Sequence, residues 1–384
     1  MCKSGICGCI GGPMPGKFAY SAFSAELDLT PVRKLEEVVA MSPEDMARAS
    51  RVVSSAYNEL LQVAASLENR EYRELMTECI SGPKVAFLEM YKTDDDRRKL
   101  FDEMVKLGFF NKDDNPDYVF PAGNMNPQTY LTAPSSHNDF YNAHPGGLAI
   151  TVAYNIRMAE AYTSNYRQMF GLPISRDLPA AALCIHEYPK VWLYQWQKDG
   201  SWLEEPRTVY DDTWHAHCIY VTAELMYRRY DARIVMAMAA AHQLSALNAS
   251  MDGRDVVCDW VGLERVAHFI QAAAVMAQVD PVDYGLLERK GGKLVLAPQP
   301  AEQWVTHLAD MNWPYTMGAA HLLTAPLLQD FAESQLGIAR KGREFNQLKN
   351  YVWSQLGQIP LYEILVREGR DAANRTIGRL VSKH

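Results

Sequence analysis

His186-Glu187-Tyr188-Pro189-Lys190 places a histidine beside a carboxylate at the end of an apolar run, with a lysine four residues after the histidine. Adjacent imidazole and carboxylate groups can bind one metal ion through nitrogen and oxygen together, and the lysine can hold an anion beside it. Asp177-Leu178-Pro179 is predicted to open the helix that carries the pair, and Pro189 to end it. The stretch predicts a metal site at a helix end; the alternative is a histidine placed there by the helix dipole.

Helical patterns dominate the sequence on both sides of this stretch. Ser42-Pro43-Glu44-Asp45 combines an N-cap, an N1 proline and an acid three residues after the cap, and apolar residues at spacings of three and four predict a long amphipathic helix behind it. Thr93 caps a second predicted helix. Further helical patterns cover 148–170, 261–279 and 301–384. Two more predicted helices begin at Asp212 or Thr213 and at Asp231. The one strand-like segment is 290–297, so the fold is predicted to be all-α.

A long segment without helical pattern, 111–147, separates two helical regions and is rich in proline and asparagine. Ordered loops of this length are uncommon in compact domains and are often functional. The segment is interpreted as a wall or lid over a site, or as a plain interdomain connection. The predicted organisation is a flexible segment 1–18, a helical region 19–110, the loop 111–147, a metal domain 148–325 and a helical extension 326–384.

Further candidate ligands follow His186 and Glu187 at about one set per predicted helix, as a metal site in a helical bundle requires. His217 lies in His215-Ala216-His217, where His215 points away because it is only two residues distant. His242 ends a run of small residues, and Asp280 follows the next apolar segment. Asp280 is the first choice for the last acidic ligand of the metal, and Asp310 is the second.

Four segments resemble the HD superfamily, whose members are all-helical metalloproteins with an adjacent His-Asp pair. Pro145-Gly146-Gly147-Leu148 is similar to the start of the first ligand helix, and His186-Glu187 with Lys190 is similar to the central motif. His217-Cys218 lies where the family has a His-His pair, and Ala239-Ala240-Ala241-His242 is similar to the segment that carries the last histidine ligand. The resemblance, over about 135–315, implies an HD-like helical bundle that holds one or two metal ions.

The sequence departs from this pattern at the metal ligands themselves. Thr151 stands where the family has its first histidine, Glu187 replaces an aspartate, and Cys218 replaces one histidine of a pair. Either His137 or His144 substitutes from the loop, or the site holds one ion, or it is inactive.

The resemblance implies a hydrolase that acts on a small phosphate ester or nucleotide. In that mechanism a divalent ion (Mn, Mg, Ni, Zn or Fe) bound by His186, Glu187, His217 and His242 lowers the pKa of a water, and Lys190 stabilises phosphate charge. The predicted catalytic residues are Lys190 and Glu187. Two alternatives remain: a di-iron oxygenase of the same superfamily, and a degenerate domain that binds a ligand or a protein.

Bulk properties limit the partners. The 384 residues carry a net charge of -8, which argues against a nucleic-acid backbone and an anionic membrane as main partners but permits a small anionic substrate. Apolar runs fall short of the roughly 18–20 residues of a transmembrane helix, and a signal peptide is not recognisable, so a cytoplasmic protein is expected.

Two groups of side chains have open interpretations. The seven cysteines include Cys2, Cys7 and Cys9 in a glycine-rich N-terminus, which could bind a soft metal, form a redox disulfide or be a plain tail. The scattered cysteines of the helical segments are expected to be buried free thiols. Trp192, Tyr194, Trp196 and Trp202 are expected to pack in the core or to form an aromatic wall for a substrate.

Overall fold

The computed structural model describes residues 23–116, 119, 127–205, 216–241, 260–298 and 301–383, without the side chains of 260–265, 315 and 320. Within these residues 63% of the chain is helical and 4% is strand, so the all-α prediction is confirmed. None of the described helices is long and apolar enough to cross a membrane.

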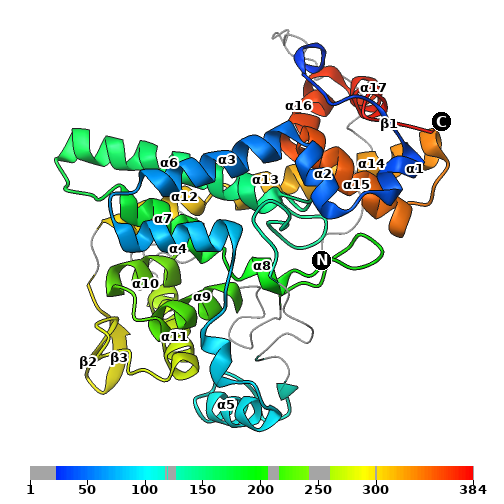
Figure 1. Ribbon diagram of the computed structural model, residues 1–384. Helices are drawn as coiled ribbons and strands as arrows, with labels where there is room; N and C mark the ends of the chain where they lie inside the picture. Colours follow the sequence, from blue (N-terminus) through cyan, green and yellow to red (C-terminus); the bar gives the residue numbers. More distant parts are fainter. Residues whose placement is uncertain are drawn as a thin grey trace, which may run out of the picture.

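The helices fall into three groups along the chain (Figure 1). The N-terminal group comprises η1 (Ser24–Glu26), α1 (Leu35–Ala40), α2 (Pro43–Ala49), α3 (Arg51–Ser66), α4 (Arg70–Ser81), η2 (Phe87–Met90) and α5 (Asp94–Lys106). The central group comprises α6 (Gly147–Phe170), α7 (Asp177–His186), α8 (Lys190–Leu193), α9 (Ala216–Tyr227), α10 (Ala232–Ala239), α11 (Trp260–Ala277), α12 (Glu302–Asp310) and α13 (Trp313–Gly318). The C-terminal group comprises the π-helix η4 (Ala319–Thr324), α14 (Ala325–Phe331), the π-helix η5 (Ala332–Leu336), α15 (Arg343–Leu356), α16 (Gln358–Glu368) and α17 (Arg370–Gly378).

Helix α7 is surrounded by other helices. All of its residues are buried, and it packs against α4, α6, α9, α10 and α12. Its sequence, Asp-Leu-Pro-Ala-Ala-Ala-Leu-Cys-Ile-His, is rich in alanine, so neighbouring helices can approach it closely on every side. This packing carries His186, at the helix C-terminus, into the interior of the protein.

The start of α6 requires both glycines of Pro145-Gly146-Gly147. Gly146 has a φ of +78°, and a Cβ added there would lie 2.2 Å from the Val53 Cγ1 atom of α3. A Cβ on Gly147 would lie 1.9 Å from the backbone oxygen of Asn142. The motif therefore closes a tight turn and lets α6 pack against α3 (Figure 1).

The helix predicted behind Ser42 is shorter than expected. Ser42 caps α2 as predicted, because its hydroxyl accepts a hydrogen bond from the Asp45 amide at 3.1 Å. The helix ends at Ala49, and Ser50 then caps α3 by accepting from the Val53 amide. The Ser50 hydroxyl also donates to the backbone oxygen of Ser354, so a buried tertiary contact fixes the break.

The predicted strand 290–297 contains the turn and the second strand of a β-hairpin. Strands β2 (Leu287–Lys290) and β3 (Lys293–Leu296) pair antiparallel, with Leu287 opposite Leu296. Gly291 and Gly292 form the connection with φ values of +57° and +77°, which suit the right-handed twist of a two-residue hairpin.

The two ends of the described chain pack together (Figure 1). Strand β1 (Arg33–Lys34) pairs parallel with β4 (Val381–Ser382), and α15 packs against α1, α2 and α3. The Glu368 carboxylate accepts hydrogen bonds from the amides of Phe23 and Ser24 at 2.7 Å. The predicted domain boundaries within 19–384 stay a prediction, and the flexible segment 1–18 with Cys2, Cys7 and Cys9 lies outside the described residues. Of the four cysteines expected to be buried free thiols, Cys79, Cys184 and Cys218 are so, and Cys258 lies outside the described residues.

Candidate metal centre and its cavity

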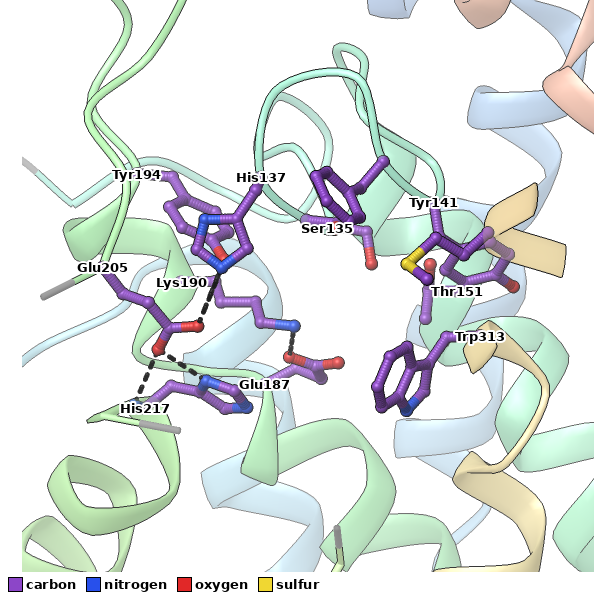
Figure 2. Close-up of a pocket in the computed structure, with 13 residues that line it drawn as sticks. Ser135, His137, Tyr141, Thr151, Glu187, Lys190, Tyr194, Glu205, His217 and Trp313 are labelled. Atoms are coloured by element: carbon purple, nitrogen blue, oxygen red, sulfur yellow. Dashed lines mark hydrogen bonds and ion pairs between the residues drawn. The ribbon is translucent and has the colours of Figure 1, made fainter. Parts of the chain in front are cut away.

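A cavity of about 320 Å³ opens beside the C-terminal end of α7 (Figure 2). Its walls come from the loop before α6, from α6 itself, from the stretch between the end of α7 and Glu205 that includes α8, from α9 and from α13. The lining residues are Ser135, Ser136, His137, Phe140, Tyr141, Thr151, Glu187, Lys190, Tyr194, Glu205, His217, Trp313 and Met317.

His186, Glu187 and His217 form a buried group that could hold a metal ion. Each offers one ligand atom, and these atoms lie within 4.8 Å of one another. The His186 Nε2 atom lies 3.6 Å from the Glu187 Oε1 atom. The local sequence supplies two ligands at the end of α7, and the packing of α9 against α7 supplies the third.

Both histidine rings are held through Nδ1. The His186 Nδ1 atom lies 3.1 Å from the backbone oxygen of Leu183, and the His217 Nδ1 atom lies 2.7 Å from the Glu205 Oε2 atom. Each Nδ1 must donate, because its partner is an acceptor, so Nε2 is the ring nitrogen that can serve as a metal ligand. Burial lowers the pKa of His217 and so favours the neutral form of its ring. A carboxylate that orients the ring in this way is a common second layer around a metal.

Glu187 and Lys190 form a buried ion pair across one helical turn (Figure 2). Burial alone would raise the Glu187 pKa, but Lys190 and the two histidines outweigh it, and the pKa is lowered. Burial would likewise lower the Lys190 pKa, but Glu187 outweighs it, and the pKa is raised. Both groups are therefore charged at neutral pH.

Asp310, at the end of α12, is a second acid that approaches His186, after Glu187. Its Oδ1 atom lies 3.7 Å from the His186 Nε2 atom and accepts a hydrogen bond from the Asn155 amide group of α6 at 2.7 Å. Burial raises the Asp310 pKa to about 6, and the nearby negative charge of Glu187 adds to the shift. A cation beside His186 would lie within reach of this carboxylate.

The charge balance of the centre fits a cation. Glu187, Glu205 and Asp310 are buried carboxyl groups, whereas Lys190 is the one lysine or arginine among the described residues that line the cavity. The pKa of Glu205 is far below its usual range because His217 and His137 outweigh the effect of burial. Lys190 pairs with Glu187 and His137 lies beside Glu205, and a divalent ion at this centre would offset the negative charge that is left on the buried carboxyl groups.

Thr151 does not act as a histidine would at the first ligand position. Its hydroxyl lies 3.1 Å from the backbone oxygen of Gly147, to which it donates, and accepts from the Asn142 side chain at 3.0 Å. One turn later on the same helix, Asn155 contacts Asp310. Helix α6 therefore contributes to the centre through Asn155.

Neither loop histidine joins the His186 group. His137 lines the cavity, where its Nδ1 atom lies 3.2 Å from Glu204 and its Nε2 atom 3.6 Å from Glu205. These two glutamates outweigh burial and raise the His137 pKa. His144 is fully buried outside the cavity lining, with its Nδ1 atom 3.1 Å from the backbone oxygen of Pro145.

His144 gives a pH-dependent loss of stability that can be measured. Burial lowers its pKa to about 4, so below the ordinary pKa of 6.5 the unfolded chain binds a proton that the folded chain does not. We expect His144→Asn to remove this term, so that the wild-type advantage in unfolding free energy shrinks by about 3 kcal/mol between about pH 7 and about pH 4. Urea denaturation of both proteins across this range measures it, and parallel pH curves would contradict it.

Three sequence predictions have other outcomes. His242 and His215 lie outside the described residues. Asp280 is placed on the surface: its side chain is 45% exposed, accepts from the Val282 amide at 2.7 Å and pairs with Arg289. Asp280 therefore does not join the His186 group, whereas Asp310, the second choice, lies near His186 because α12 packs against α7.

Some residues of the centre were missed from the sequence. Asn155 could have been found, because it lies four residues after Thr151 and so on the same helix face. Glu205 carries no local signal, since it lies outside any helix and reaches His217 through tertiary folding. Of the four aromatic residues, Trp192 is buried in the core and Tyr194 lines the cavity. The rings of Trp196 and Trp202 pack against each other with their centroids 4.9 Å apart.

No protein-family model, curated protein or solved structure matches this chain at a significant level.

Proposed function

We propose that this protein is an HD-type, metal-dependent hydrolase that acts on a small phosphate ester. The observation that carries the proposal is that His186 and His217 both use Nδ1 for a hydrogen bond, which leaves Nε2 as the ligand atom, and that ligand atoms of both rings gather with Glu187 within 4.8 Å. Imidazole nitrogen with carboxylate oxygen suits the ions Mn, Mg, Ni, Zn and Fe. To these three donors we add Asp310, whose Oδ1 atom lies 3.7 Å from the His186 Nε2 atom, as a proposed fourth.

The residues of the centre have separate roles in this proposal. His186, Glu187, His217 and Asp310 would hold the ion, which when bound lowers the pKa of a coordinated water. Glu205 keeps the His217 ring in its ligand tautomer. Lys190 lies beside Glu187 at the cavity wall, where its ammonium group stabilises the negative charge that develops on a phosphoryl group.

A second function, binding without catalysis, is favoured by two observations. Thr151 uses its hydroxyl within the first turn of α6, and Lys190 already compensates the charge of Glu187. A domain of this kind would bind a ligand in the cavity without a metal. The di-iron oxygenase has less support, because two ions need more ligands than the three donors that gather in the described residues.

Replacement of Lys190 tests the catalytic proposal. We expect Lys190→Met to lower kcat/KM for hydrolysis of 4-nitrophenyl phosphate by about 100-fold to 1,000-fold, because the transition state loses its cation. Affinity for Mn²⁺ is expected to persist, since Glu187 then has no competing partner for its charge. Lys198→Met, at an exposed lysine, is the matched control and should leave both quantities unchanged.

The possible outcomes separate the two functions. Hydrolysis that is as fast in Lys190→Met as in the control would contradict the role of Lys190. Hydrolysis that survives His217→Ala would contradict the whole catalytic assignment. A wild-type protein that binds no metal and hydrolyses no phosphate ester would support the binding function instead.

A further inference from the structure

The cavity has two chemically different ends (Figure 2). Glu187, Lys190, His217 and Glu205 occupy one side. On the opposite side Tyr141 and Trp313 project from the loop before α6 and from α13. Phe140 and Met317 also line the cavity, so its wall holds far more apolar than charged surface.

The aromatic side is held in place by contacts outside the cavity. The Tyr141 hydroxyl accepts a hydrogen bond from the Asn312 side chain at 2.9 Å. The Phe140 ring stacks on the His321 ring with centroids 5.3 Å apart, and the Phe140 backbone oxygen accepts from the Gln358 side chain at 2.8 Å. A wall whose side chains are already ordered binds a flat apolar group at a low entropic cost.

Size and charge limit what the cavity can take. Its volume of about 320 Å³ is at the lower end of the roughly 300–1,000 Å³ of ligand pockets. Among the described lining residues, Lys190 is the one lysine or arginine, and Glu187 already pairs with it. One phosphoryl group, shared between Lys190 and a divalent ion, fits these charges better than a chain of phosphates.

We infer that the substrate is a small phosphate monoester of an aromatic or similarly flat apolar alcohol. The phosphoryl group lies at Glu187, Lys190 and His217, and the organic group lies against Trp313 and Tyr141. The inference rests on the proposed function, because it takes the charged end as the reacting end. The Trp313 ring is the main contact, since it faces the charged cluster across the cavity (Figure 2).

Binding of two non-hydrolysable phosphonates tests the inference without catalysis. In calorimetric titrations of the Mn²⁺-loaded full chain, phenylphosphonate should bind at least about tenfold more tightly than methylphosphonate, because the phenyl ring is buried. Trp313→Ala should remove most of this ratio. Trp304→Ala is the matched control, because Trp304 is 41% exposed on α12 and does not line the cavity. Adenosine triphosphate, which carries more negative charge than either phosphonate, is titrated as the comparison ligand.

Each result decides the question. A ratio near one, a ratio that survives Trp313→Ala, binding of neither phosphonate, or tighter binding of adenosine triphosphate would overturn the inference. A ratio that depends on Trp313 would support it. Hydrolysis of phenyl phosphate is assayed separately: if it is absent while the ratio holds, the hydrolase proposal fails and the assignment of the aromatic wall stands.

Discussion

Replacement of His186 by alanine is expected to weaken binding of Mn²⁺ or Zn²⁺ by more than about 100-fold, the largest effect we expect at the centre. The His186 Nε2 atom lies 3.6 Å from Glu187 and 3.7 Å from Asp310, so it is the imidazole nitrogen that approaches both acids of the proposed donor set. Its removal takes a nitrogen ligand away from both carboxyl groups. Metal analysis of the purified protein and competitive titration with a chelating dye measure the change.

A milder variant tests whether the loss of metal affinity comes from loss of a ligand. Glu205→Gln keeps both ligand histidines but replaces the carboxylate that accepts from the His217 Nδ1 atom, so a loss of about 10-fold to 100-fold is expected. His268→Ala is the matched control, because this ring packs against Phe109 and does not line the cavity. Circular dichroism and thermal denaturation show that each variant is folded.

Metal stoichiometry then decides between the functions. One Mn, Mg, Ni or Zn ion in the wild-type protein supports the hydrolase, two irons support the oxygenase, and no metal supports the binding module. If His186→Ala binds metal as well as the wild type does, the ligand assignment is wrong.

The second large effect concerns stability. Gly147→Ala is expected to lower the free energy of unfolding by about 3 kcal/mol or more, because overpacking against fixed backbone cannot relax cheaply. The new Cβ would lie 1.9 Å from the Asn142 backbone oxygen, which accepts from the amides of Ser135 and His144. Asn142 also donates from its amide to the Gln358 side chain at 2.7 Å. The loop therefore cannot move away without loss of these hydrogen bonds.

A second glycine provides the control for this variant. Gly378, at the end of α17, has open space where a Cβ would be added and no positive φ. Gly378→Ala should leave stability unchanged or raise it by up to about 1 kcal/mol. Urea denaturation of the three proteins measures both effects. Equal midpoints for Gly147→Ala and the wild type would contradict the close packing of α6 on the loop.

Local signals in the sequence were enough for the helices and for part of the centre. Ser42 and Thr93 cap helices as their side chains predict, since capping depends on residues within one turn. Glu187 and Lys190 meet because three residues span one turn. The length of the helix behind Ser42 could not be predicted, because the break at Ser50 depends on a hydrogen bond to Ser354, far away in the sequence.

The sequence by itself determined that the chain is mainly helical and that the helix opened at Asp177 carries His186 and Glu187 at the end of an apolar run. Only the tertiary structure decided that Asp310 rather than Asp280 faces His186, that Glu205 orients His217, and that an aromatic wall lies opposite Lys190. The physical reason is that the spacing of apolar residues along a helix predicts which face of the helix is buried, but not which other helix packs against that face. That neighbour is set by the packing of α6, α9 and α12 around α7.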